Sequence, residues 1–219
     1  MARNFNGSTQ NADGTSLITS AAITISAWFK TTDTTTEQFI AGVQMGATRT
    51  GHYLIADGSA AGDPVGIRSR TGAGAVWGYS TTGYSSGVWH HGAGTVNTGG
   101  TSRAAFIDGG SKGTNGSTRD PSSATPVNEI GAAVAAGDRF FTGSIADIAI
   151  WATVLSDEEI ASLAKGICPL LIRPQSLVHY IPFVGKTSPE IEIVGGNSIT
   201  LYNSPTADAQ PKLIGYGRR

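Results

Sequence analysis

The sequence has little of what cross-links a chain or gives it a strong charge. A single cysteine, Cys168, excludes an internal disulfide and a Cys-x-x-Cys metal site. Only 14% of the 219 residues are charged, against about 25% in an average globular protein. The formal net charge is −1, which predicts no general attraction to nucleic acid or to an anionic membrane.

Long apolar segments are also missing. No run approaches the roughly 18–20 apolar residues that span a membrane. Residues 1–8 lack the apolar core of a secretory signal. We therefore expect a protein that is made and used without crossing a membrane by itself.

What the sequence does have is glycine, at 30 residues, together with many threonines and serines. Short strands joined by glycine-rich turns fit this composition better than helices do. A β-sandwich of roughly 200–250 residues commonly forms one domain. These features predict an all-β protein.

Three segments carry the clearest strand patterns. Residues 22–30 alternate, with Ile23, Ile25, Ala27 and Phe29 on one face, which predicts a half-buried strand. Residues 104–107 are apolar on both faces, and residues 145–151 form a third strand. Weaker strand patterns cover residues 38–44, 52–56, 64–69, 75–80, 88–96 and 127–131.

One helix is predicted with unusual precision. Ser156 and Glu159 have the spacing of a capping box, in which each side chain binds the backbone of the other residue. Leu155 and Ile160 have the spacing of a hydrophobic staple around the same turn. Gly166 is expected to end the helix.

Beyond Gly166 the sequence becomes rich in proline, which predicts an extended segment or edge strands. Residues 190–194 and 198–202 could form a small hairpin. We therefore expect a β-sandwich domain over residues 1–166 and a C-terminal extension over residues 167–219. The extension is interpreted as an assembly arm, whose contacts would come from Leu170, Leu171, Ile172, Leu177, Tyr180 and Phe183.

Several segments resemble, in the same order, the laminin-G-like jelly-roll domains of the concanavalin-A-like fold. The segments that carry the resemblance are 5–7 (FNG), 23–30 (ITISAWFK), 87–95 (GVWHHGAGT), 105–109 (AFIDG), 129–131 (EIG), 141–151 (FTGSIADIAIW) and 155–160 (LSDEEI). The resemblance implies a jelly-roll sandwich of two stacked antiparallel sheets, with a short helix against one end. Proteins with this fold include lectins, glycosidases, adhesion modules and virion proteins, so the fold alone does not give the function.

No catalytic constellation is visible in the sequence. Glu190-Ile191-Glu192 is the only Glu-x-Glu pattern, and we interpret it as a solvated edge strand outside the jelly roll. A glycosidase of this fold would need two carboxylates on one strand of the sandwich. His90 and His91 are neighbours whose side chains point to opposite faces of a strand, so they cannot easily bind one metal ion together. The resemblance implies a framework role for both.

Candidate binding residues are few. Asp13, Asp57, Asp63 and Asp138 lie in predicted loops without a Ca²⁺-binding cluster, so no metal and no cofactor is assigned, although Ca²⁺ remains open. Aromatic rings beside polar loops can stack on sugars. The best candidates for a glycan site are Trp77, Tyr79 and Tyr84, whereas Trp28, Trp89 and Trp151 are expected to be framework residues.

Three functions remain open at this point. The segment 169–180 resembles extensions found after such domains in tailed-phage structural proteins. This favours a non-enzymatic virion protein that decorates the capsid, with the major capsid protein as partner and a homo-oligomer, a trimer, as the expected assembly. The alternative is a lectin or adhesin that binds host or surface glycans, and a glycosidase is the third hypothesis.

Overall fold

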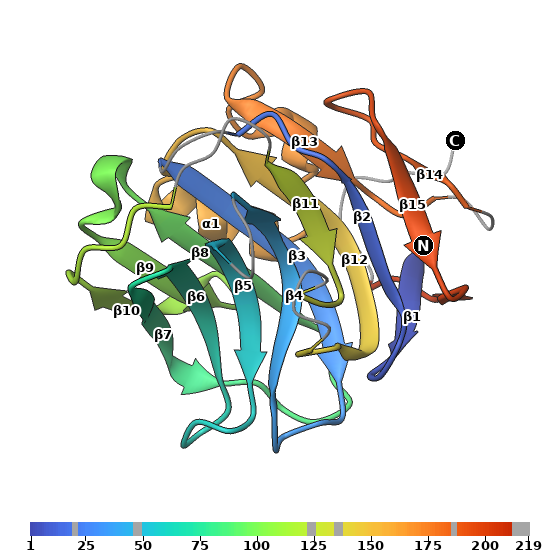
Figure 1. Cartoon of the computed structure of the whole chain (residues 1–219), viewed down its shortest axis with the longest axis horizontal. Helices are drawn as coiled ribbons and strands as arrows, with labels where there is room; N and C mark the ends of the chain where they lie inside the picture. The colour runs from blue at the N-terminus through green and yellow to red at the C-terminus, as the bar shows by residue number, and fades with distance from the viewer. Residues whose placement is uncertain (19–21, 46–49, 122–125, 134–137, 185–187, 212–219) are drawn as a thin grey trace.

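The computed structural model describes residues 1–18, 22–45, 50–121, 126–133, 138–184 and 188–211. They form two stacked antiparallel sheets of eight strands each (Figure 1). Sheet A has the order β10 (Gly110–Asn115), β9 (Arg103–Ile107), β8 (His90–Val96), β3 (Ile23–Thr31), β12 (Thr142–Trp151), β1 (Ala2–Asn6) and β16 (Thr206–Asp208), with β13 (Leu177–Ile181) also paired to β12. Sheet B has the order β14 (Glu190–Ile191), β15 (Ser198–Tyr202), β2 (Asn11–Thr15), β11 (Val127–Ile130), β4 (Glu37–Gln44), β5 (Gly51–Asp57), β6 (Pro64–Thr71) and β7 (Gly74–Gly83). The predicted jelly-roll sandwich is confirmed.

The main core lies between the two sheets. Alternating apolar residues of β3 pack there against residues such as Leu54 and Ile67 of sheet B. The prediction that β3 is half-buried was wrong, because Thr24 and Ser26 on its other face are also buried. The segment that leads into the helix covers this face, and the Thr24 hydroxyl binds its backbone at Thr153.

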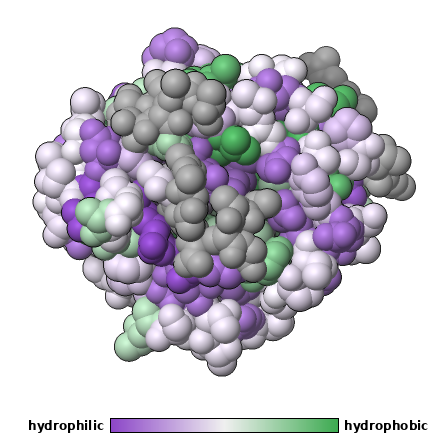
Figure 2. Space-filling model, viewed as in Figure 1, coloured by the Kyte–Doolittle hydropathy of each residue, from purple (hydrophilic) through white to green (hydrophobic). Residues whose placement is uncertain are grey.

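The helix α1 (Asp157–Ala164) forms as predicted. The Ser156 side chain accepts from the Glu159 backbone N–H, and the Glu159 side chain accepts from the Ser156 backbone N–H at 2.7 Å. Leu155 and Ile160 are both buried in a second apolar cluster on the outer face of sheet A. In Figure 1, α1 lies behind sheet A, while sheet B faces the viewer. Figure 2 shows the same side as a space-filling surface, on which hydrophilic and hydrophobic residues are intermixed.

The C-terminal extension contributes strands to both sheets. In sheet A, β13 pairs with β12 and β16 pairs with β1, while β15 pairs with β2 in sheet B. The predicted hairpin is present as β14 and β15. Two short 3₁₀ turns, Thr98–Gly100 and Pro169–Leu171, complete the elements. The division at residue 166 stays a prediction, since strands from both parts pair within each sheet.

The six residues predicted to mediate assembly fall into two groups. Leu177, Tyr180 and Phe183 are buried in the protein's own clusters, so they do not face a neighbouring subunit. Leu170 and Leu171 are exposed, Leu171 by 72%. Ile172 is partly buried, and its carbonyl accepts the Trp151 indole N–H at 2.8 Å. The assembly role of this segment stays a prediction. No helix among the described residues is long and apolar enough to cross a membrane.

Candidate functional site

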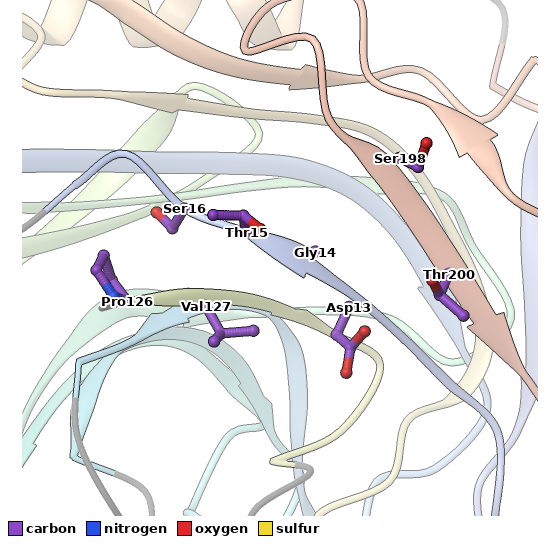
Figure 3. A pocket seen from close by; sticks show the side chains of 8 residues that line it. All are labelled: Asp13, Gly14, Thr15, Ser16, Pro126, Val127, Ser198 and Thr200. Atoms are coloured by element: carbon purple, nitrogen blue, oxygen red, sulfur yellow. The ribbon is translucent and has the colours of Figure 1, made fainter.

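The outer face of sheet B carries an open groove of about 560 Å³. Figure 3 shows the residues that line it, from β2, β15 and the start of β11. We call it the sheet B groove, and its lining residues are Asp13, Gly14, Thr15, Ser16, Pro126, Val127, Ser198 and Thr200. Its volume is within the range of about 300–1,000 Å³ that is typical of small-ligand sites.

Strand pairing explains why these side chains meet. In the antiparallel register, Asp13 faces Thr200 on one side and Glu129 on the other, while Thr15 faces Val127. Directly opposed residues in a sheet point to the same face. Three segments that are distant in sequence therefore place their side chains together on the outer face.

The chemistry of the groove is polar with one aromatic at its margin. The Tyr202 side chain, 42% exposed, lies next along β15 on the same face and hydrogen-bonds to Asp13. Burial raises the pKa of Asp13, and the bond from Tyr202 partly offsets this. The negative charge of Asp13 is the first cause of a raised pKa for Tyr202. Exposed threonine and serine hydroxyls complete a surface that can both donate and accept hydrogen bonds.

A second polar and aromatic cluster lies on the same face at the opposite edge of the sheet. The Trp77 indole N–H donates to Glu37 at 2.9 Å, and the Arg68 guanidinium lies 5.3 Å from the Trp77 ring centroid. Glu37 also accepts hydrogen bonds from Arg68 and Arg139. One face of the Trp77 ring and its polar atom are therefore occupied from within the protein.

The hydroxyls of the other two residues predicted to bind glycan form hydrogen bonds within the protein. The Tyr79 hydroxyl donates to Asp57 at 2.6 Å. Tyr84 is buried in the main core, and its hydroxyl donates to the Asp33 carbonyl at 2.8 Å. Trp77 and Tyr79 thus share a face with the sheet B groove, whereas Tyr84 faces the interior. Their glycan role stays a prediction.

The interpretation of Glu190 and Glu192 as a solvated strand was wrong. The two residues are only 1% and 2% exposed. Glu190 accepts a hydrogen bond from Arg3 Nε at 2.7 Å, and Glu192 pairs with His179. Each carboxylate is buried because the fold supplies it with a buried basic partner.

His179 also contacts Ser16, which gives a Ser–His–Glu arrangement. Ser16 Oγ lies 3.2 Å from His179 Nε2, and the Leu17 N–H donates to the same nitrogen at 3.0 Å. A catalytic triad needs a serine that reaches the substrate and a base free to take its proton. Ser16 borders the sheet B groove but is only 5% exposed, and His179 is fully buried. His179 Nε2 already accepts the Leu17 N–H, so it is not free to take the Ser16 proton. The arrangement ties the end of β2 to the C-terminal extension.

The paired histidines are buried framework residues of β8, as the resemblance implied. His90 Nδ1 lies 2.7 Å from Asp108, and His91 packs edge-on against Trp28 on the other face. Within the part of the chain that the structure describes, no three His, Cys, Asp or Glu side chains come together as a metal site would require. Asp57 and Asp138 instead bind neighbouring side chains, Ser59 and Arg139.

Known structures share this fold. A putative carbohydrate-binding protein from Bacteroides ovatus is 15% identical, with a TM-score of 0.69, over 95% of this chain and 60% of its own. Domain 4 of an arabinanase from Geobacillus stearothermophilus, solved with arabinotriose, is 21% identical, with a TM-score of 0.61, over 74% and 76%. The CBM40 domain of a Ruminococcus gnavus sialidase is 16% identical, with a TM-score of 0.55, over 75% and 98%. At these identities the likeness shows the fold alone.

The sequence itself gives the family. No curated protein matches the chain. Residues 5–161, which are most of the chain, match the laminin-G-type family described as the concanavalin A-like lectin/glucanases superfamily. The chain therefore belongs to the concanavalin A-like lectin/glucanases superfamily.

Proposed function

We propose that this protein is a non-catalytic carbohydrate-binding domain and that the sheet B groove is its ligand site. The observation that carries the proposal is the convergence of an exposed tyrosine, a carboxylate and several hydroxyls on one open groove. Sugars present hydroxyl groups at their edges and C–H bonds on their faces. An aromatic ring covers the sugar face, while carboxylates and hydroxyls bind its edge.

The proposal agrees with the structural neighbours. One is named for carbohydrate binding, one was solved with arabinotriose, and the CBM40 domain was also solved with sialyllactose. The carbohydrate-binding protein and the CBM40 domain are named for binding, which supports binding over hydrolysis. The capsid-decoration role, the homo-oligomer and the virion location remain predictions from the sequence.

Two alanine variants test where a glycan binds. Binding is first sought on a glycan array and then measured by calorimetry for the wild type and for Tyr202→Ala and Trp77→Ala. Tyr202 is exposed and contributes no core contact, so its loss should leave the fold intact. We expect Tyr202→Ala to weaken binding at least tenfold and Trp77→Ala to change it less than threefold.

The other outcomes are equally informative. Loss of binding in Trp77→Ala alone would move the site to the opposite edge of sheet B. Absence of binding across a broad array would refute the carbohydrate-binding proposal. Circular dichroism of each variant shows whether a loss of binding reflects a loss of fold.

A further inference from the structure

The charge of the sheet B groove bears on which glycans it can accept. Asp13 is the ionisable side chain among the described residues that line it. The same lining contributes the hydroxyls of Thr15, Ser198 and Thr200, which carry no charge. A ligand in this groove therefore meets one negative group and a set of neutral ones.

The strands on both sides of Asp13 add no compensating positive charge. On β11 the residue directly opposite is Glu129, a second acidic residue, which is buried. On β15 the opposite residue is Thr200, and the Tyr202 hydroxyl donates to the Asp13 carboxylate. Asp13 is partly withdrawn from water, so a second negative charge beside it would be poorly screened.

The carboxylate is well suited to neutral sugars. An ionised carboxylate only accepts hydrogen bonds, and it offers about four lone-pair positions. Tyr202 uses part of this capacity, which leaves positions open toward the groove. Two neighbouring hydroxyls of a sugar can donate to the two oxygens at once, and such charge-assisted bonds are stronger than neutral ones.

We infer that the sheet B groove selects uncharged glycans, which donate adjacent hydroxyls to Asp13, and discriminates against glycans that place a carboxylate or sulfate there. This inference rests on the proposed function and names its ligand class. Asp13 both attracts hydroxyl donors and repels anions, so a single side chain supplies affinity and selectivity.

The test compares neutral with anionic sugars, and it includes lactose with two anionic derivatives of the same backbone. Calorimetry compares arabinotriose and lactose with 3′-sialyllactose, 3′-sulfolactose and trigalacturonic acid, for the wild type and for Asp13→Asn. We expect the wild type to bind its best neutral sugar at least tenfold more tightly than any anionic one. In Asp13→Asn, neutral binding should weaken and the preference should fall below threefold.

Two further variants make the result specific. Asp120→Asn removes the same charge from an exposed position outside the groove lining and should leave the preference unchanged. Thr200→Lys places a positive charge opposite Asp13 on an exposed position and should bring anionic sugars within threefold of neutral ones. The second variant retains Asp13, so it tests the charge argument even where Asp13→Asn is unstable.

The outcomes separate this inference from the proposed function. Equal or tighter binding of an anionic sugar by the wild type overturns the selectivity and leaves the binding function standing. The selectivity is also overturned if both Asp13→Asn and Thr200→Lys keep the wild-type preference for neutral over anionic sugars. If none of the five sugars and no glycan of a broader neutral array binds, both the selectivity and the carbohydrate-binding function are overturned.

Discussion

Replacing His52 with glutamine should make the stability of this protein less sensitive to acid. His52 is 0% exposed, and its Nδ1 lies 2.9 Å from Ser69 Oγ. Burial, together with the positive charge of Arg103, lowers the pKa of His52 to about 3. In the unfolded chain the same histidine has a pKa of about 6.5.

The sign of the effect follows from where the proton binds. Below about pH 6.5, His52 binds a proton in the unfolded chain but stays neutral in the folded protein. The free energy of unfolding therefore falls as the pH falls. This loss continues down to the folded pKa of about 3. Its slope reaches at most about 1.4 kcal/mol per pH unit, which amounts to about 2 kcal/mol between pH 6.5 and 4.5.

Urea unfolding followed by tryptophan fluorescence measures the effect at several pH values. The variant His52→Gln should have a lower free energy of unfolding than the wild type at pH 6.5. Because the variant has no histidine to titrate at this position, the difference between the two free energies should narrow by about 2 kcal/mol between pH 6.5 and 4.5. The control Ser69→Ala removes the partner of His52 and retains the titrating group, so its curve should run parallel to the wild type. A parallel curve for His52→Gln would refute the reasoning.

Three further predictions concern stability and are checked by urea unfolding. Ser156→Ala removes the helix cap and should lower the free energy of unfolding by about 1 kcal/mol. An unchanged free energy would mean that the capping box does not stabilise the protein. Gly94→Ala places a methyl group 2.6 Å from a side-chain carbon of the facing sheet and should cost about 1–3 kcal/mol, whereas Gly72→Ala, with open space around it, should cost under about 0.5 kcal/mol. Glu190→Gln leaves Arg3 buried without its counter-charge and should cost about 3–5 kcal/mol; a loss below 1 kcal/mol would contradict the buried ion pair.

The elements that the sequence predicted well are those with strong local signals. The capping box of Ser156 and Glu159 needs only residues three positions apart, and it is present in the structure. The strand of residues 22–30 also has a clear period of two. Its second face was misjudged, because Thr24 and Ser26 are polar and their burial depends on a segment more than a hundred residues away.

The segment around β14 shows most clearly what local sequence cannot provide. A polar and apolar alternation normally places glutamate outward and isoleucine inward. Here Glu190 and Glu192 point inward, while Ile191 and Ile193 are exposed. The reversal is possible because Arg3 and His179 offer buried partners, and no local pattern reveals a partner 187 residues distant along the chain.

Only part of the candidate site could be predicted from the sequence. The alternation of Ser198, Thr200 and Tyr202 with apolar neighbours could have identified an exposed polar face. Its position beside Asp13 depends on the register between β15 and β2, which sequence patterns do not specify. The prediction of Trp77 found the correct sheet face, but it could not foresee that Glu37 and Arg68 already occupy the indole.

The position of β1 has a consequence for how the chain folds. Arg3 lies between Ile145 of β12 and Ala207 of β16, so β1 completes its pairing only with a strand that is far away along the chain. Contacts this distant in sequence slow folding, because a long loop must close before they form. During synthesis, one edge of β1 therefore stays unpaired until β16 has emerged from the ribosome, and in this period that edge can pair with other chains.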